Sequence, residues 1–439
     1  DNPPLEFDEQ LQYRVEKLPG GGDNVVSTFD NITSAEFALY FDMNVVPESL
    51  LVYASALPIM LEEVGVIKDG QPIPADEMFE RLRQEILGLN IYHDMNYDRG
   101  RVELTIRASG SVLDESVTAV DWLATVLFNA DWRVENLPRI RDAIDASLTN
   151  ARNFMKNWEE YWVSYPTGAY WKQTNPLILS TGSYLTRQHS FWRLKWMFKD
   201  AENAEVLKEF DSFMSALAEY GSQADRDHLK ALAVRLSTGA ESEADTLVDA
   251  DMLAAGQELS DEAMALVKIA ATDLVQMIAG LPDNSLSQDW AYLCRQMSTD
   301  LAVEPVTVLD KFRAIMNTIR KKDNVRAHVV GSPASQDRLL PLLNAVVERL
   351  SDEPRTVQAY SDEPIINSRL GQRTPGDINP VYVGLINENT RNGLVWFTAP
   401  TASYYKADNN DMLDYLAVRL YGGSGPHGSI PGEFSDAPE

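Results

Sequence analysis

The feature that most constrains this chain is a short polar turn between two strands of alternating hydrophobicity. Residues 89–95 and 101–109 both alternate apolar and polar side chains, as half-buried strands do, and only the turn around Gly100 separates them. Strands joined by so short a turn must be antiparallel neighbours, because a parallel crossover needs roughly a dozen residues or more. The chain is therefore predicted to contain a mainly antiparallel or mixed sheet.

Helices alternate with strands in this first part of the chain. The residues before the paired strands predict a strand over 34–43, with Phe37, Leu39 and Phe41 on one face. Apolar residues at three-to-four spacing predict a helix from Pro47 to the glycine stop at Gly65. Two more helices are predicted, over 76–87 and 114–128. Alternation of this kind is typical of an α+β layer.

The middle of the chain is predicted to be almost entirely helical. The clearest helical patterns cover 137–161, 184–198, 204–220, 261–279 and 306–319. Within this block, the polar run 237–251 is predicted to be a linker or an exposed hairpin, and a solvated helix face explains it equally well.

After residue 322 the pattern of strands and helices returns. It predicts elements at 325–330 (strand), 336–350 (helix), 356–360 (strand), 381–386 and 393–399 (paired strands) and 411–421 (helix). The Gly- and Pro-rich tail 424–439 offers no further strand, so this second α+β domain is expected to be incomplete.

The predicted architecture is thus α+β, with two domains of mainly antiparallel sheet covered by helices and joined by a helical block. The expected ranges are 1–225 for the first domain with its long helices, 226–322 for the helical block, and 323–439 for the truncated second domain.

Composition excludes several classes of partner. The chain has 439 residues, and 38 Lys and Arg against 66 Asp and Glu give a net charge of −28. Such a charge repels phosphate backbones and anionic lipid, so neither nucleic acid nor a membrane is expected as a partner. The single cysteine, Cys294, excludes an internal disulfide and leaves the compartment open.

The sequence holds no motif for a metal site within one helix. The histidines at 93, 189, 228, 328 and 427 stand apart, and neither H-E-x-x-H, nor H-x-x-E-H, nor a pair of cysteines occurs. His93, Asp94 and Asp98 could form a metal cluster, but a strand end followed by a polar turn explains them better.

Candidate nucleophiles and binding residues are equally weak. The segment 422–426 lacks the last glycine of G-x-S-x-G, because Pro426 occupies that position. Cys294 lies on an apolar helix face and is predicted to be a buried structural thiol. A dense aromatic series could line a groove for extended peptides, although a helical core is the preferred interpretation; it comprises Phe154, Trp158, Tyr161, Trp162, Tyr165, Tyr170, Trp171, Trp192 and Trp196. No catalytic, cofactor-binding or metal-binding residue is assigned.

The order of these elements nevertheless resembles that of a known family. The strand, the helix beginning at Pro47-Glu48 and the stop at Gly65 are similar to those that open the second half of pitrilysin- and insulinase-type (inverzincin) zinc metallopeptidases, in particular the presequence-protease branch. Residues 137–151 resemble the long helix of that family, and 323–331 resemble the strand that opens its last domain. Residues 414–428 resemble the helix that precedes the R-E-K-G-G-A-Y-G segment of that domain.

This resemblance implies a clamshell peptidase of which the chain is the C-terminal, non-catalytic half. Zinc and the general base would belong to an N-terminal half carrying H-x-x-E-H, and unfolded peptides would be the substrates. The Arg- and Tyr-bearing segment of the family should follow His427, but residues 429–439 do not resemble it, so no family residue is carried over. The chain alone is expected to be inactive and to serve as a chamber wall that confines and orients peptides.

Two alternatives stay open at this point. The chain could be a free-standing, non-catalytic scaffold subunit that binds peptides or proteins. It could also be a helical interaction protein, in which case residues 323–421 would form no α+β layer.

Overall fold

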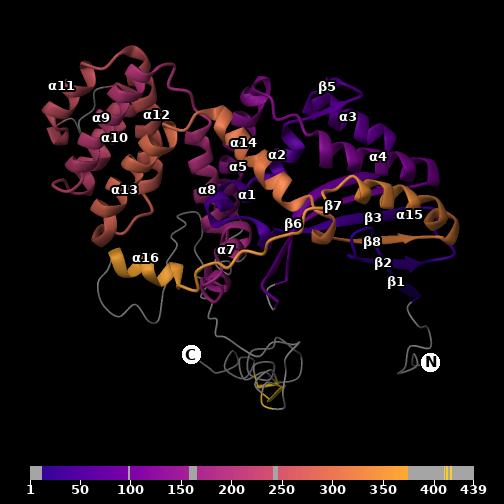
Figure 1. Cartoon of the computed structure of the whole chain (residues 1–439). Coiled ribbons are helices and arrows are strands. Elements are labelled where there is room, and N and C mark those ends of the chain that lie inside the picture. The colour runs from indigo at the N-terminus through magenta and orange to yellow at the C-terminus, as the bar shows by residue number, and fades with distance from the viewer. Residues whose placement is uncertain are drawn as a thin grey trace, which may run out of the picture.

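A computed structural model describes residues 12–96, 99–157, 166–240 and 246–373, together with 410, 412, 413, 416 and 417. The predicted strands 381–386 and 393–399, most of the predicted helix 411–421 and the segment 422–426 lie outside the described residues. A sheet covered by helices occupies one end of the molecule and a bundle of helices the other (Figure 1).

The sheet has six strands in the order β1-β2-β8-β3-β7-β6. Their bounds are Tyr13–Lys17 (β1), Asp23–Thr28 (β2), Val325–Gly331 (β8), Ala35–Asp42 (β3), Arg101–Gly110 (β7) and Gly88–Asn96 (β6). β2 and β8 are parallel, and the other four pairs of neighbours are antiparallel. The prediction of a mixed, mainly antiparallel sheet is confirmed, as is the hairpin around Gly100.

Helices cover one face of this sheet. α4 (Leu113–Asn129) packs on β7, and α15 (Pro333–Glu348) packs on β8 and on α4, so both lie on the same side of the sheet (Figure 1). Phe37, Leu39 and Phe41 point into this layer and are completely or almost completely buried, as the alternation of β3 predicts. The opposite face carries polar and charged side chains from β3, β7 and β8, and we call it the open face.

The helix predicted over 47–65 forms in three pieces. They are η2 (Glu48–Leu50), α1 (Leu51–Ala54) and α2 (Leu57–Glu63). Pro58 lies in the first turn of α2, where its missing N–H costs least, whereas in one continuous helix it would leave a carbonyl unpaired. Gly65 ends α2 with a φ of +69°, and a Cβ there would lie 2.4 Å from the Ile73 carbonyl oxygen, so only glycine fits.

A small hairpin and another helix lead back to the sheet. β4 (Val66–Lys68) and β5 (Gln71–Ile73) pair with each other, and the sequence did not predict them. α3 (Ala75–Glu85) follows and confirms the helix predicted over 76–87, and α4 confirms the helix predicted over 114–128.

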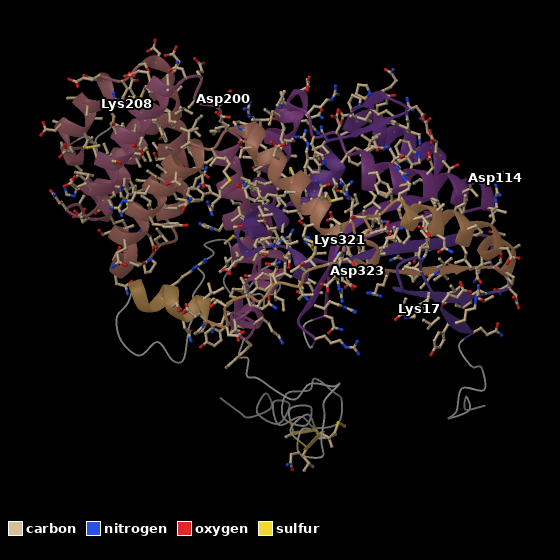
Figure 2. The ribbon with its side chains drawn as sticks, viewed as in Figure 1. Lys17, Asp114, Asp200, Lys208, Lys321 and Asp323 are labelled. Atoms are coloured by element: carbon tan, nitrogen blue, oxygen red, sulfur yellow. The ribbon has the colours of Figure 1, made fainter. Side chains whose placement is uncertain are left out.

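The middle of the chain is helical, as predicted. Its helices are α5 (Leu137–Asn157), α7 (Pro176–Gly182), α8 (Tyr184–Met197), α9 (Ala204–Tyr220), α10 (Arg226–Thr238), α11 (Ala250–Gln257), α12 (Asp261–Ile278), α13 (Asp283–Leu301) and α14 (Pro305–Ile319). Helices α9 to α13 form the bundle (Figure 1). Asp114 at the start of α4 and Lys208 on α9 mark the two far ends of the molecule (Figure 2). The described residues of the polar run 237–251 lie at the end of α10, between α10 and α11, and in the first turn of α11.

Buried polar contacts join the bundle to the centre of the molecule. The carboxylate of Asp273 on α12 accepts hydrogen bonds from the indoles of Trp192 and Trp196, at 3.1 and 3.0 Å, and from Lys195 at 2.7 Å. On α13, Asp300 accepts two hydrogen bonds from the guanidinium of Arg193. All three donors to Asp273 and Arg193 belong to α8, so this one helix anchors α12 and α13 through groups that are costly to leave unpaired.

The segment 325–348, after α14, forms the strand and the helix predicted for it, but its strand joins a different sheet from the one expected. The predicted strand and helix both form, as β8 and α15, but β8 lies between β2 and β3 in the first sheet. Parallel pairing between strands so far apart in the chain leaves no signal in the sequence. Because 325–348 contribute to an α+β layer, the alternative of a purely helical interaction protein is wrong. The predicted division into three ranges stays a prediction.

The strand predicted over 356–360 is absent, because the described residues 352–363 contain no strand. The chain there runs past residues 44–46. The backbone amide of Gln358 donates a hydrogen bond to the Asn44 carbonyl, and the side-chain hydroxyl of Tyr360 donates one to the Val46 carbonyl. Residues 43–45 form the 3-10 turn η1 (Met43–Val45), which cannot supply the extended ladder that a strand requires. The last described helix is α16 (Ile365–Arg373).

Candidate functional site

The residues that the sequence singled out do not converge on one site. His93 and Asp94 are neighbours on β6 and therefore point to opposite faces of the sheet. Asp98 lies outside the described residues. Burial lowers the pKa of His93 to about 3, and its buried Nε2 has no hydrogen-bond partner among the described residues. In the same part of the chain, no group of three His, Cys, Asp or Glu side chains is placed to hold a metal ion.

Cys294 is completely buried on α13, which confirms its interpretation as a structural thiol. Burial raises the pKa of this thiol, so the reactive thiolate is disfavoured. Trp192 and Trp196 are also buried in the core, so they do not line a groove, whereas 44% of Trp171 is exposed. Residues 158–165 of the aromatic series lie outside the described residues.

The helices give no sign of a membrane segment. None of the helices among the described residues combines the length and the apolar character that crossing a bilayer requires.

The open face of the sheet carries a network of paired charges. Arg326 on β8 donates two hydrogen bonds, of 2.7 and 2.6 Å, to the carboxylate of Glu103 on β7, and Glu103 is only 4% exposed. Arg326 also lies over the ring of Tyr40, 3.9 Å from its centre. Burial works against the charged guanidinium, but the hydrogen bonds with Glu103 raise the pKa of Arg326. This pair is therefore a stable part of the fold.

A second part of the network contains a tyrosine, a histidine and a glutamate. The Tyr40 hydroxyl lies 2.7 Å from Nδ1 of His328, and Nε2 of His328 lies 3.4 Å from the carboxylate of Glu36. Burial lowers the pKa of His328, although Glu36 opposes the shift, so the ring is neutral at pH 7. With its proton on Nε2, the ring accepts the hydrogen bond of Tyr40. Arg107 forms an ion pair with the same Glu36.

A cavity of about 410 Å³ opens at one end of this network. It lies where β2, β7 and β8 begin and β3 ends, beside the glycine loop 20–22. Lys321 and Asp323 mark the start of β8 near this cavity (Figure 2). We call it the end cavity. Three of its carboxylates have cationic partners: Glu103 pairs with Arg326, Asp42 with Arg355 at 3.4 Å, and Asp23 with Lys17. The fourth, Asp323, accepts hydrogen bonds from the backbone amide of Arg355. Every carboxylate of the end cavity thus has a polar partner, and three of the four have a cation.

A second cavity, of about 650 Å³, lies beside the edge of the sheet. Helix α3 and strand β6 form its walls, and α2 and α4 contribute one residue each. We call it the edge cavity. Its lining is mainly apolar and consists of Met78, Phe79, Leu82, Leu87, Gly88, Leu89, Ile91 and Val126, with Glu62, Asp76, Glu80 and Arg83 as charged residues.

One charged group of the edge cavity differs from the others. Asp76 pairs with Arg139 at 3.2 Å, and Glu80 pairs with Arg83. Glu62, by contrast, has no ion-pair partner among the described residues. Burial raises the pKa of its carboxyl group to about 6, although a hydrogen bond from the backbone amide of Ile91 opposes this rise. A half-buried carboxylate without an ion-pair partner in an apolar cavity is a feature typical of binding and reactive sites.

Sequence reasoning missed Glu62 for a physical reason. Glu62 and Glu63 adjoin each other at the end of an apolar helical pattern, and both fit the polar face of an amphipathic helix. In the structure Glu63 pairs with Arg139, whereas Glu62 is directed toward α3 and β6. Only the packing of α3 against β6 distinguishes the two carboxylates.

Comparison with known proteins gives little further guidance. No family model and no curated protein matches the chain. Many solved structures are similar to it, and two of them serve as examples. One is the inactive domain of a peptidase M16 from Pseudomonas fluorescens, with 12% sequence identity, a TM-score of 0.35 and coverage of 80% of this chain and 54% of that one. The other is a conserved protein from Enterococcus faecalis, with 11% identity, a TM-score of 0.38 and coverage of 79% and 53%.

The chain spans about half the length of each of these two structures. Because both TM-scores lie below 0.5, no conclusion about this chain rests on them. Its α+β class follows from its own sheet and helices.

Proposed function

We propose that this chain is the non-catalytic half of a clamshell zinc metallopeptidase and that it confines and orients unstructured peptides for hydrolysis by the other half. The sequence resemblance supports this proposal, because its segments occur in order as the strand β3, the helices η2 to α2 ending at Gly65, the helix α5 and the strand β8. The absence of H-x-x-E-H from the sequence agrees with a non-catalytic role.

The observation that carries the proposal is the free edge of β6 beside the edge cavity. Among the described residues, β6 pairs with β7 on one side only, and it ends the order of strands. An extended peptide can add to such an edge through its backbone, while an adjacent cavity receives one of its side chains. The edge cavity adjoins β6 at Gly88, Leu89 and Ile91; the Ile91 backbone amide already donates a hydrogen bond to Glu62, and β6 continues from there to Asn96.

The described residues do not fit a zinc ion, since they contain no cluster of suitable ligands. Zinc would belong to the catalytic half, and no step of hydrolysis is assigned to this chain. Its own contribution would be positional: it would hold an extended peptide in one orientation and so lower the entropic cost of reaching the catalytic geometry.

A binding experiment tests the proposal. Fluorescence anisotropy of a labelled, unstructured peptide is expected to show saturable binding to the chain, and mass spectrometry is expected to show no cleavage, with or without added zinc. Absence of binding would overturn the peptide-orienting role, and zinc-dependent cleavage by the chain alone would overturn the non-catalytic role.

A second measurement concerns the partner. Adding a polypeptide that carries the H-x-x-E-H half is expected to produce a stable complex and cleavage of the same peptide. Binding of peptide without any association between the two halves would instead favour the free-standing scaffold subunit.

A further inference from the structure

We propose that the edge cavity binds the side chain of a lysine or arginine of an extended peptide, with Glu62 as the counter-ion of that side chain. This inference rests on the proposed peptide-binding function and specifies what its site selects.

The walls of the edge cavity suit the alkyl part of such a side chain. Met78, Phe79 and Leu82 on α3 face Leu89 and Ile91 on β6 across the cavity. Lysine and arginine carry a chain of methylene groups that is stabilised by apolar surroundings, provided that the charged end finds a polar partner. A cavity of about 650 Å³ has room for either side chain.

The charge of the cavity distinguishes a cationic guest from an apolar or acidic one. Asp76, Glu80 and Glu62 line the cavity against a single cation, Arg83, which is already paired with Glu80. A lysine or arginine would provide the cationic partner that Glu62 lacks among the described residues, whereas an apolar guest would cover this half-buried carboxylate and leave it only the backbone amide of Ile91. An acidic guest would add a like charge.

The other charged groups around Glu62 are compensated. Glu63, its neighbour on α2, pairs with Arg139 of α5 at 2.6 Å, and the same Arg139 reaches Asp76 on α3. The cavity residues from β6 and α4 carry no charge. A cation that enters the cavity would therefore pair with Glu62, the carboxylate of its lining that has no ion-pair partner among the described residues.

The position beside β6 explains why the guest should be part of an extended chain. Ile91 is 6% exposed and lines the cavity, and its backbone amide influences the Glu62 carboxyl group. A peptide that runs along β6 at this point directs alternate side chains toward the helix-covered side of the sheet, where the edge cavity lies. One residue of the peptide would thus place its side chain beside Glu62.

The test compares three labelled peptides that differ at one central position, which holds lysine, norleucine or glutamate. In anisotropy titrations with the whole chain, the lysine peptide is expected to bind about tenfold more tightly than the norleucine peptide, as for one charge-assisted hydrogen bond. The glutamate peptide is expected to bind most weakly.

The variant Glu62→Gln removes the charge and keeps the shape. It is expected to abolish the preference for lysine over norleucine: the lysine peptide should bind about tenfold more weakly than to the wild type, and the norleucine peptide no more weakly than to the wild type, because the carboxylate that it would cover is gone. Glu135→Gln, in the exposed η3 (Val134–Asn136), is the matched control and should keep the full preference. Circular dichroism establishes whether both variants fold.

The pH dependence of the wild type gives an independent measurement that needs no variant. The preference for lysine is expected to grow as the pH rises from about 5 to about 7.5, because a bound cation favours the ionised carboxylate of Glu62. Equal binding of the lysine and norleucine peptides at every pH would overturn this inference while leaving peptide binding intact. Failure of all three peptides to bind would overturn the proposed function as well.

Discussion

The two cavities of this protein differ in how their charges are compensated. In the end cavity, the buried carboxylate of Glu103 is held by two hydrogen bonds from Arg326, and Asp42 and Asp23 also have cationic partners. In the edge cavity, Glu62 lies between apolar walls and lacks such a partner among the described residues. Paired charges stabilise a fold, whereas an unpaired buried charge costs free energy until a ligand compensates it. This difference is the reason for proposing a binding role for the edge cavity and a structural role for the end cavity.

The largest expected effect is at the paired site. Arg326→Ala removes both hydrogen bonds to the buried carboxylate of Glu103 and leaves it only the ion pair with Arg101, at 3.4 Å, so the free energy of unfolding is expected to fall by about 2–3 kcal/mol. Chemical denaturation monitored by circular dichroism measures this change. The double variant Arg326→Ala with Glu103→Ala should recover part of the loss, because it removes the buried carboxylate that has lost its two hydrogen bonds. A loss below about 1 kcal/mol in the single variant would contradict the structural role of the end cavity.

The unpaired site is expected to respond in the opposite direction. The folded-state pKa of Glu62, about 6, lies above the ordinary value of 4.5, so its ionisation destabilises the folded protein as the pH rises through this range. Glu62→Gln should therefore raise the free energy of unfolding at pH 7.5 by about 1 kcal/mol, with solvent screening taken into account, and by almost nothing at about pH 4.5. Denaturation curves at the two pH values measure the difference, and equal curves for both proteins at both values would count against it.

A smaller effect is expected within the network of the open face. Tyr40→Phe removes the hydrogen bond to His328 but keeps the ring under Arg326, so unfolding should become easier by about 0.5–1 kcal/mol. Tyr13→Phe is the control, because Tyr13 on β1 is 62% exposed and should tolerate the change without a measurable difference. If both variants have the same stability as the wild type, the hydrogen bond contributes nothing.

The smallest effect is expected on the outer side of α3, next to the edge cavity. Arg81 pairs with Glu77 one turn earlier, and both side chains are largely exposed. Arg81→Ala should cost no more than about 0.5 kcal/mol, and 1 M salt should remove most of this difference. A loss comparable to that of Arg326→Ala would show that exposure does not separate the two kinds of ion pair in this protein.

Local elements were well predicted because their signals are local. The alternation of Phe37, Leu39 and Phe41 identifies β3 and its buried face, and the turn at Gly100 fixes β6 and β7 as antiparallel neighbours. The predicted strand at 356–360 was wrong for the complementary reason. Its composition permits an extended chain, but the neighbouring residues 43–45 form a turn and offer no ladder.

The candidate site was not predictable in the same way. Glu62 and Glu63 have the same residue type, the same helix and adjacent positions, yet one forms an ion pair and the other lines a cavity. The pairing of Arg326 with Glu103 was equally hidden, because it depends on the register of β8 against β3 and of β3 against β7.

The sequence by itself determined the α+β class, the antiparallel hairpin, the positions of most helices and the absence of a zinc motif. Periodicity and turn chemistry act over a few residues, so they can be read along the chain. Tertiary structure alone decided that β8 enters the centre of the first sheet, that β6 is the last of its described strands, and that one carboxylate of α2 lies beside β6 with no ion-pair partner in the described part of the chain. Those outcomes depend on contacts between distant segments, and the free energy of burying or pairing a charge is set only when such segments meet.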